Sequence, residues 1–508
     1  MRFVLCWAVA FAAAVLVHAF APPVHAQADP KAQKKADEAK ELVTAFLTDI
    51  SKGEHAAAFK RLSKPTFPFN SADDTRKYWD DLIGWHGQFK ELGEVTASTT
   101  EAGTLATARV KFERWEYVFT ARLDDGKLSF PTLRPVPLEG YGVLRASHGC
   151  MVGPAPKSDA PGVMRRGRGV VTFAVPGTYR DQVPLSFEVK AEPAKAMRGY
   201  KLRQREDGLN WVCDVTVVTD GPVTVWWEAT VLVADRKPVN LPKAATPEVT
   251  PGVERWVRPT GCVQSDDTAV KKLADELAKD TPDIGDYARK VTDWVAKNRG
   301  TGKPFITLDA AAAVGCGGSC TSRANLSAAL LRARGIPART IAHLPTWAGP
   351  LYVHWLTEYW HPNQGWVTIE PSRNQNQPSP TTYAVINVAT PDDEDHAEFA
   401  SLRSGVMAGA PRLSSRDIDG GIVPLLEDHW NKFDSRVIGL AVPLAKLSAT
   451  DAEWKALSAA ATAAHAKLVA EGRTGAIKPE RRTAAWEAVT TKDVSAKKLT
   501  EVLTPLVK

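Results

Sequence analysis

The stretch that decides the fold covers residues 315–339 and reads GCGGSCTSRANLSAALLRARGIPAR. Glycines before Cys320 allow a tight loop, because glycine reaches backbone angles that are closed to other residues. Ser319 is a favoured residue directly before a helix, so a helix is predicted to begin at or near Cys320. Its apolar residues lie on more than one side, which indicates a buried helix. Gly335 and Pro337 are expected to end it.

The position of Cys320 favours the reactive thiolate form of its side chain. A thiol in the first turn of a helix faces unpaired N–H groups and the positive end of the helix dipole, and both favour the thiolate. The spacing of Gly318, Cys320, Ala324 and the segment 329–339 resembles the nucleophile helix of the transglutaminase-like superfamily. The resemblance implies a papain-like core, in which a cysteine at this place works with a histidine and an acid on neighbouring strands.

Candidate partners lie in two runs of aromatic and β-branched residues, 352–360 and 366–370, around a Pro-Asn-Gln-Gly turn. This pattern is typical of an antiparallel hairpin. His354 and Glu370 are separated by an even number of positions, which allows them to share one face. A four-residue loop would put them on opposite faces. The catalytic interpretation therefore requires a loop of odd length, such as 361–363, or a bulge.

The hairpin segment also resembles the second signature of the family, a His-aromatic strand followed by Gly-Trp-hydrophobic-acid-Pro. The acid of the family is usually Asp, and the sequence has Glu370 there. A glutamate can also orient an imidazole. The resemblance thus implies a triad of Cys320, His354 and Glu370. The backbone N–H of Cys320 is expected to be one oxyanion donor. The Trp or Gln that serves as a donor in some relatives is absent from residues 307–319.

Length and composition indicate an ordinary globular protein of several domains. The 508 residues are too many for one hydrophobic core. Apolar residues make up 44% and charged residues 24%, as in soluble proteins. The net charge of +6, from 64 basic and 58 acidic residues, comes without a dense basic run and gives no indication of nucleic-acid binding.

Residues 1–26 have the pattern of a secretory signal peptide, with a positive Arg2, an apolar stretch and a small-residue cleavage site that ends at Ala26. The apolar stretch is also just long enough for an uncleaved membrane anchor. Pro22 and Pro23 favour cleavage. No later segment of the sequence is apolar enough to span a bilayer, so we expect a periplasmic or extracellular protein without an integral membrane segment.

Five cysteines follow residue 26, an odd number in an oxidising compartment, so at least one thiol stays unpaired within the chain. They are Cys150, Cys213, Cys262, Cys316 and Cys320. Their pairing is open: either none of them pair and most are buried, or Cys316 forms a bridge to another cysteine or competes with Cys320. The Cys316-x-x-x-Cys320 spacing also suits a redox or metal site. No second Cys or His pair lies at zinc spacing, so neither a metal nor another cofactor is predicted.

The predicted fold class is multi-domain α+β. Residues 30–137 show three helices followed by alternating strands near 93–99, 105–113, 116–123 and from 128. This order resembles the cone-shaped domains related to nuclear transport factor 2. No acid–histidine pair is placed for catalysis there, so the expected role is ligand binding or dimerisation.

The next region, 138–257, is predicted to be a β-rich sandwich or barrel. Its strands are expected at 170–175, 183–189, 209–218 and 223–233. The Asp220-Gly221 pair predicts a hairpin between the last two. The catalytic domain is predicted at 262–390, with helices at 267–279 and 283–298 before the nucleophile.

The C-terminal part is divided into a linker or extension at 391–447 and a helical region at 448–508. The acidic run 391–396 is interpreted as a solvated loop in preference to a cation site. Helices near 450–471, 478–488 and 493–506 are predicted to form a small bundle.

Two functional hypotheses follow. In the first, the chain is an exported cysteine enzyme that acts on an amide of a protein or peptide through a thioester acyl-enzyme. Water as acceptor would make it a peptidase or amidase, and a lysine amine would make it a transglutaminase. In the second, the chain is a binding or scaffold protein that keeps the fold without turnover.

Overall fold

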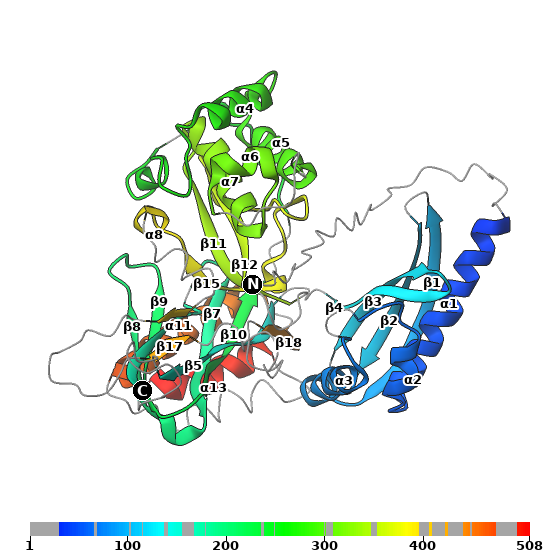
Figure 1. Cartoon of the computed structure of the whole chain (residues 1–508). Coiled ribbons are helices and arrows are strands. Elements are labelled where there is room, and N and C mark those ends of the chain that lie inside the picture. The colour runs from blue at the N-terminus through cyan, green and yellow to red at the C-terminus, as the bar shows by residue number, and fades with distance from the viewer. Residues whose placement is uncertain are drawn as a thin grey trace, which may run out of the picture.

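A computed structural model describes most of the chain from residue 30 onwards. The described residues are 30–65, 69–100, 103–113, 115–136, 141–154, 167–177, 179–234, 238–247, 249–298, 300, 308–346, 353–395, 406–408, 422–424, 440–447, 450–473 and 495–507. They form a mixed α+β fold with four sheets (Figure 1). The expected signal peptide at 1–26 and the expected helix at 478–488 lie outside the described residues.

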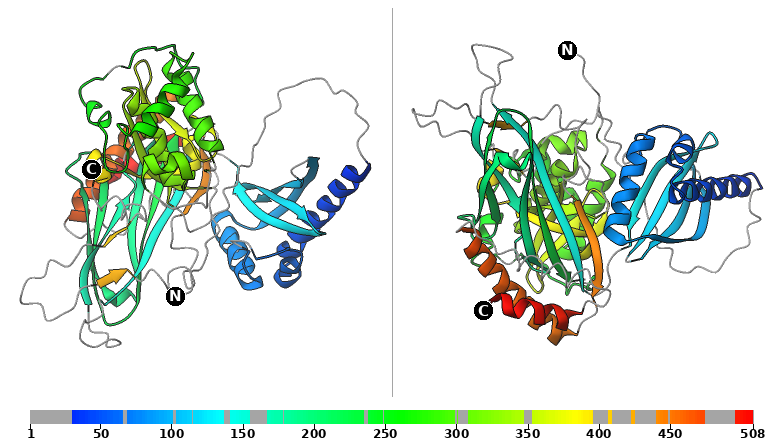
Figure 2. Two further views of the ribbon diagram at one scale, coloured as in Figure 1. Left: turned by 45° about the horizontal axis from the view of Figure 1, so that its top comes forward. Right: turned by 90° about the horizontal axis from the view of Figure 1, so that it is seen from below.

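The N-terminal part forms a lobe beside the rest of the molecule, drawn in blue in Figures 1 and 2. Its antiparallel sheet has the order β1-β2-β3-β4, and α1 packs on β1 and β2. This order of helices and strands agrees with the sequence pattern, while the resemblance to nuclear transport factor 2 stays a prediction. The elements are α1 (Pro30–Ser51), α2 (His55–Lys60), α3 (Ala72–His86), β1 (Phe89–Thr100), β2 (Gly103–Phe112), β3 (Glu116–Asp124) and β4 (Lys127–Pro135).

The β-rich part consists of two sheets whose inner faces share one apolar core that includes Phe173 and Trp227. One sheet has the order β17-β5-β10-β7, with β18 also on β5, and the other has the order β16-β6-β9-β8. The strands are β5 (Tyr141–Pro154), β6 (Gly167–Val175), β7 (Gln182–Glu192), β8 (Met197–Gln204), β9 (Trp211–Thr219), β10 (Val223–Ala234), β16 (Val406–Ala408), β17 (Ile422–Pro424) and β18 (Leu440–Leu447).

The hairpin predicted at Asp220-Gly221 is wrong. β9 and β10 belong to different sheets, and the turn between them crosses from one sheet to the other. Both edges of each strand are already occupied, because β9 lies between β6 and β8 and β10 lies between β5 and β7. The turn is stabilised by Thr219, whose Oγ1 accepts from the N–H of Gly221 and donates to its carbonyl.

Of the two alternatives for 391–447, linker or extension, the described part of that segment has the character of an extension. β16 pairs with β6, while β17 and β18 pair with β5, so the late strands extend both sheets of the β-rich part. The terminal helices α11 (Asp451–Arg473) and α13 (Ala496–Val507) pack against each other, and α11 also lies on β7 and β8 (Figure 2). The C-terminal region is therefore joined to the sandwich.

The core domain is built around helix α7. Helices α4, α5 and α6 contact it, and so do strands β11 and β12 of a sheet with the order β14-β13-β12-β11-β15. Helix α6 was not among the predicted elements. The elements are α4 (Thr268–Ala278), α5 (Ile284–Lys297), α6 (Ala310–Cys316), α7 (Cys320–Ala333), β11 (Ala338–Pro345), β12 (His354–His361), β13 (Gly365–Glu370), β14 (Gln375–Asn376) and β15 (Tyr383–Val388).

The acidic run after β15 is not a solvated loop. It forms the short helix α8 (Pro391–Asp395), and its carboxylates meet arginines of three different segments. Asp393 pairs with Arg205 of the β-rich part. Glu394 forms a fully buried pair with Arg332 of α7, with Nη1 to Oε2 at 2.8 Å. The Glu394–Arg332 pair therefore holds α8 against the C-terminal half of α7, and the Asp393–Arg205 pair holds α8 against the β-rich part.

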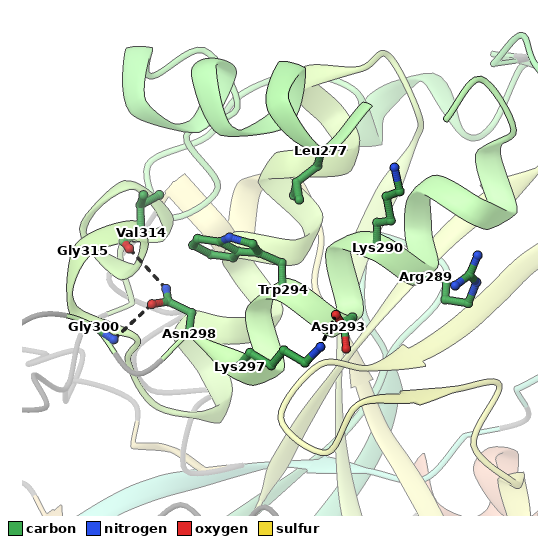
Figure 3. Close-up of a pocket in the computed structure, with 10 residues that line it drawn as sticks. All are labelled: Leu277, Arg289, Lys290, Asp293, Trp294, Lys297, Asn298, Gly300, Val314 and Gly315. Carbon is green, nitrogen blue, oxygen red and sulfur yellow. Dashed lines mark hydrogen bonds and ion pairs between the residues drawn. The ribbon is translucent and has the colours of Figure 1, made fainter. Parts of the chain in front are cut away.

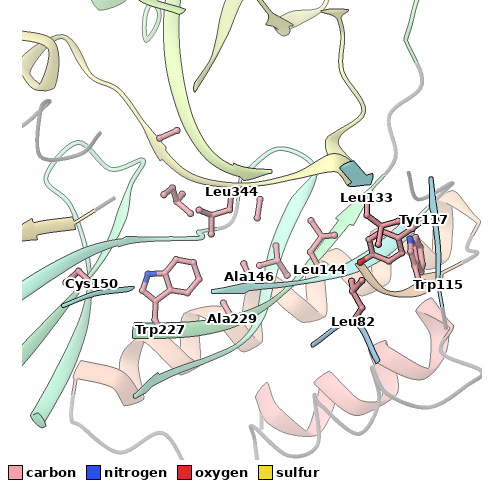
Figure 4. Close-up of a cluster of buried hydrophobic side chains, with 14 of the residues drawn as sticks. Leu82, Trp115, Tyr117, Leu133, Leu144, Ala146, Cys150, Trp227, Ala229 and Leu344 are labelled. Atoms are coloured by element: carbon pink, nitrogen blue, oxygen red, sulfur yellow. The ribbon is translucent and has the colours of Figure 1, made fainter. Parts of the chain in front are cut away.

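One apolar cluster joins the parts of the molecule (Figure 4). It contains Tyr117 and Leu133 of the N-terminal lobe, Leu144 of β5 and Leu344 of β11. Polar contacts strengthen the junction of sandwich and core: the amide of Gln182 bonds both the N–H and the carbonyl of Val385. Each part thus helps to position the sheet that carries His354.

Candidate active site

Cys320 is the first residue of α7, as the sequence predicts. Ser319 precedes it in an extended conformation, but its side chain does not cap the helix. Instead, Ser322 Oγ donates to the carbonyl of Ser319 at 3.1 Å. Gly317 and Gly318 both have positive φ, of 74° and 65°. A Cβ atom on Gly318 would lie 2.0 Å from Ser322 Oγ, so this loop requires glycine.

Side chains of α7 hold the loop before the nucleophile. Arg323 donates from Nε to the carbonyl of Gly317 at 3.2 Å and from Nη2 to that of Asn298 at 3.3 Å. Asn325 Nδ2 donates to the carbonyl of Leu308 at 2.6 Å. These polar residues lie on an almost wholly buried helix. The hydrogen bonds that they make to loop carbonyls explain why α7 carries so many polar residues although it is central to the core.

The hairpin has a loop of odd length, as the catalytic interpretation requires. His361 pairs with Gly365, so the loop consists of the three residues 362–364. The odd-length loop 361–363 is the example taken from the sequence, and the observed loop lies one position later. The ladder continues to Thr357 opposite Ile369. Continued by one pair, this register puts Glu370 opposite Leu356. Glu370 and His354 therefore share a face as diagonal neighbours, because side chains alternate along a strand.

The structure brings Cys320, His354 and Glu370 together. Nε2 of His354 lies 2.5 Å from Oε2 of Glu370. A side-chain hydrogen bond links the imidazole to the thiol of Cys320. Since Nε2 faces the carboxylate, Nδ1 is the nitrogen left for the sulfur. His354 and Glu370 are 3% and 2% exposed, whereas the residue Cys320 is only partly buried.

The electrostatics favour a thiolate–imidazolium pair. Burial by itself raises the pKa of the Cys320 thiol, but the charge of His354 and its hydrogen bond lower it, and the net shift is downward. Burial lowers the pKa of His354, but the charges of Glu370 and Cys320 outweigh it and raise the pKa to about 10. Opposite shifts in two contacting groups are what a reactive cysteine requires.

Residues 271–371 match the family model of the transglutaminase-like superfamily. This segment is a transglutaminase-like core.

Two solved structures are similar to the chain, which matches no curated protein. One is described as a "putative cysteine protease" from Cytophaga hutchinsonii, with 15% identity over 60% of this chain and 98% of that chain and a TM-score of 0.41. The other is described as a "putative protease" from Parabacteroides distasonis, with 10% identity over 55% of this chain and 68% of that chain and a TM-score of 0.14.

Two further residues contact the row, and sequence reasoning missed both. The backbone N–H of Ser372 donates to Oε1 of Glu370 at 2.8 Å, which leaves Oε2 for His354. His343 lies directly opposite His354 in the β11–β12 ladder, with ring centroids 5.1 Å apart. Burial and the charge of His354 hold the pKa of His343 well below its usual range, so His343 is a neutral packing partner.

The other end of β12 carries a second buried carboxylate. Glu358 accepts from Arg339 Nε at 2.9 Å and from Arg180 Nη1, and the hydroxyl of Tyr179 also donates to it. Arg339 stacks on Trp366 at 3.8 Å. Burial raises the pKa of Glu358, but the two arginines outweigh it and lower the pKa to about 2. Because Tyr179 and Arg180 come from the β-rich part, this cluster attaches that part to the core.

The other cysteines differ from Cys320. All five in the described residues are free thiols, so none of the disulfides left open by the sequence forms here. Burial raises the pKa of Cys150 to about 12 and, with nearby carboxylates, that of Cys262 to about 11. Among the thiols with a shifted pKa, Cys320 alone is shifted downward.

A pocket of about 510 Å³ lies beside the nucleophile loop, between α5 and the end of α6 (Figure 3). Asn298 closes one side, since its Nδ2 donates to the carbonyls of Ala313 and Val314. The ammonium of Lys297 is paired with Asp293 at 2.7 Å. No residue of the triad lines this pocket.

Neither a metal cluster nor a membrane-crossing helix occurs in the described part of the chain. No three His, Cys, Asp or Glu side chains there are grouped to hold a metal ion. None of its helices combines the length and apolar character needed to cross a bilayer.

Proposed function

We propose that the chain is a cysteine enzyme that acts on an amide of a peptide or protein. Cys320 is the nucleophile, His354 the general acid and base, and Glu370 the residue that orients the imidazole. The observation that carries this proposal is the row of sulfur, imidazole and carboxylate, with the thiol pKa lowered and the imidazole pKa raised.

In the first half of the reaction, the thiolate forms a bond to the amide carbonyl carbon, and an electron pair of the C=O moves to its oxygen. The N–H of Cys320 can stabilise this oxyanion, because the first N–H groups of a helix have no acceptor within it. The intermediate then breaks the carbon–nitrogen bond, and the departing amine takes the proton of the His354 imidazolium. A thioester and a neutral imidazole remain.

In the second half, the neutral imidazole takes a proton from the incoming nucleophile, which attacks the thioester and releases the thiolate. With water the product is a carboxylate, and the enzyme is a peptidase or amidase. With an amine it is a new amide, and the enzyme is a transferase. Glu370 stabilises the imidazolium in both halves, with its Oε1 held by Ser372.

Alkylation with iodoacetamide near pH 6 tests the nucleophile. We expect Cys320 to be labelled selectively, because its pKa is lowered, and expect His354→Ala to abolish the selectivity. Cys262 is the internal control, since it is also half-buried but has a raised pKa. Equal labelling of Cys262 and Cys320 in the wild-type protein would refute the catalytic assignment and favour a non-catalytic scaffold.

A second assay separates the two reactions. The protein is incubated with a glutamine-rich protein and a fluorescent amine, with Cys320→Ala as the blank. Fluorescence that becomes covalently bound to the substrate indicates transfer, and fragments without bound fluorescence indicate hydrolysis.

We further propose export to the periplasm or outside the cell, supported by the sequence pattern of residues 1–26. N-terminal sequencing of the mature protein tests it, with a new terminus expected directly after Ala26. Dimerisation through residues 30–137 stays a prediction, and the mass of the protein in solution tests it.

A further inference from the structure

The pocket beside the nucleophile loop has the size of a site for a small organic ligand, at about 510 Å³ (Figure 3). Three apolar side chains from three helices line it: Leu277 of α4, Trp294 of α5 and Val314 of α6. Each packs on the apolar core of the domain but is only partly buried. The pocket therefore offers apolar surface to a ligand.

The charged residues that line the pocket are mostly basic, and all of them belong to α5. They are three cations, Arg289, Lys290 and Lys297, and one carboxylate, Asp293. Lys297 pairs with Asp293 at 2.7 Å. Arg289 pairs at 3.0 Å with Asp286, which lies outside the lining. The lining therefore carries an excess of positive charge.

Lys290 differs from the other two cations in its partner. Its Nζ donates to the carbonyl of Lys279 at 3.1 Å, which holds the ammonium at the C-terminal end of α4. This partner is a neutral carbonyl, whereas the other two cations pair with carboxylates. An ammonium has three N–H donors, so further donors remain for an acceptor in the pocket. Lys290 is therefore the cation best suited to pair with an anionic ligand.

One wall of the pocket leads directly into the nucleophile loop. Gly315 lines the pocket, and five residues later the chain reaches Cys320. Gly300, which also lines it, has a positive φ of 70° and packs closely on the loop. A Cβ atom at this position would clash with the backbone of Cys316. The pocket wall and the loop are thus in direct contact.

Hydrogen bonds extend this connection to α7. Asn298, another lining residue, donates from Nδ2 to the carbonyls of Ala313 and Val314. Arg323 of α7 donates to the carbonyls of both Asn298 and Gly317. A ligand that packs on this wall therefore contacts groups that also hold the loop before the nucleophile.

We propose that the pocket binds a carboxylate attached to an apolar group, and that binding stabilises the nucleophile loop. The apolar group covers the exposed parts of Trp294 and Val314, and the carboxylate pairs with Lys290. Such a group occurs in a free aromatic or aliphatic acid and in the C-terminal residue of a peptide. The proposal does not require Cys320 to be a nucleophile, because no residue of the triad lines the pocket.

Two probes of nearly equal size test the requirement for charge. 4-Phenylbutyrate carries a carboxylate, and 4-phenylbutyramide is its neutral analogue. Their dissociation constants are measured by ligand-observed NMR titration of the full chain. We expect the acid to bind about two- to fivefold more tightly than the amide, and expect this preference to disappear in Lys290→Gln, because an exposed ion pair contributes a factor of this size. Butyrate lacks the ring and should bind at least about tenfold more weakly than 4-phenylbutyrate.

Three further variants serve as controls. Lys290→Glu should reverse the preference, so that the amide binds more tightly than the acid. Lys272→Gln removes an exposed lysine of α4 that does not line the pocket, and should leave the preference unchanged. Cys320→Ala should bind both probes as the wild-type protein does. The two lysines are exposed, so these substitutions should leave the fold intact.

Hydrogen exchange measures the effect of binding on the loop. The N–H of Gly317 donates to the carbonyl of Ala313 at 3.1 Å, so it exchanges only when this part of the chain opens. With 4-phenylbutyrate at about ten times its dissociation constant, exchange in the peptide 310–320 should slow by up to about tenfold. Exchange in the peptide 103–112 of the N-terminal lobe should stay the same.

A short peptide distinguishes the two sources of the carboxylate. N-acetyl-Ala-Ala-Phe with a free C-terminal carboxylate is compared with its C-terminal amide and with 4-phenylbutyrate. If the peptide acid binds most tightly of the three, the ligand is the C-terminus of a peptide. If 4-phenylbutyrate binds most tightly, the ligand is a free acid.

The outcomes keep this proposal separate from the proposed function. Equal binding of acid and amide to the wild-type protein, or an unchanged preference in Lys290→Gln, would refute the ligand site even if Cys320 is alkylated selectively. Unchanged exchange in the peptide 310–320 at saturating ligand would refute the connection to the loop. If Cys320 is not alkylated selectively but the acid binds as expected, the cysteine enzyme fails and the ligand site stands.

Discussion

Two buried glutamates lie on the same face of the core sheet, and their partners differ in kind. Glu358 faces Arg339 and Arg180, whose charge is permanent at any accessible pH. Glu370 faces His354, whose charge can change. Both carboxylates are almost wholly withdrawn from water, at 1% and 2% exposed. The same sheet therefore carries one carboxylate that is fixed in an ion cluster and one that supports a group able to gain and lose a proton.

Burial alone does not distinguish the two glutamates. A buried carboxylate in a cleft is a frequent sign of a functional site. Glu358 has a strongly lowered pKa and would be selected by that criterion, yet its partners hold the β-rich part against the core. The partner's ability to titrate, together with contact to a thiol, distinguishes the proposed catalytic carboxylate from the structural one.

The largest expected effects come from removing each negative charge. Glu370→Gln should lower turnover, or the rate of Cys320 alkylation near pH 6, by about 10³-fold or more, because the imidazolium loses its support. Glu358→Gln should instead lower the free energy of unfolding by about 3–5 kcal/mol, because two arginines are left buried without a counter-charge. Chemical denaturation and alkylation kinetics on the same two variants measure both effects.

The two variants are each other's control. Glu370→Gln should cost less stability than Glu358→Gln, because His354 can release its proton and become neutral while arginine cannot. Glu358→Gln should leave the alkylation rate of the folded protein within about threefold of the wild-type rate. A reversed pattern, with stability lost at 370 and reactivity lost at 358, would contradict the distinction between the two sites.

The second prediction concerns stability against pH. The pKa of His354 is raised from 6.5 to about 10, so its contribution to stability is complete below pH 6.5 and is lost as the pH rises through about 10. The pKa of Cys320 is lowered from 9.0, so its contribution is present above pH 9 and is lost as the pH falls through the lowered value. Above both pH 6.5 and the lowered pKa of Cys320, and below pH 9, the stability changes with pH that the two groups cause have opposite sign and cancel.

Cys320→Ser removes the contribution of the thiol to the change of unfolding free energy with pH. Above both pH 6.5 and the lowered pKa of Cys320, and up to pH 9, the wild-type pair should add no pH dependence. In Cys320→Ser the unfolding free energy should fall above pH 6.5, by up to about 1.4 kcal/mol per pH unit, until the pH reaches the His354 pKa of that variant. Urea denaturation at several pH values measures the difference between the two proteins. Parallel curves across this range would mean that His354 and Cys320 do not form an ion pair.

Local patterns predicted helices α4, α5 and α7, the β12–β13 hairpin and the shared face of His354 and Glu370. The start of α7 at Cys320 agrees with the glycine loop before it, although Ser319 does not cap the helix with its side chain. The shared face of His354 and Glu370 follows from parity, which is a short-range property of a hairpin. His343 and Ser372 could not be found in this way. One depends on the pairing of β11 with β12, and the other acts through its backbone N–H.

Long-range pairing explains the errors. The sequence at Asp220-Gly221 is a good hairpin turn, but the edges of β9 and β10 are taken by strands from elsewhere in the chain. β16, β17 and β18 are short or irregular segments whose strand character depends on the open edges of β5 and β6.

The smallest expected effect tests the length of the acid. The register puts Glu370 diagonal to His354, and the extra methylene of glutamate helps to span that offset, which is wider than the spacing of directly opposite residues. Glu370→Asp keeps the charge but shortens the reach, so we expect the alkylation rate at pH 6 to fall about tenfold, well short of the loss in Glu370→Gln. Full activity of the aspartate variant would mean that the strands shift to close the gap. A loss as large as that in Glu370→Gln would mean that the position of the carboxylate next to His354 matters as much as its charge.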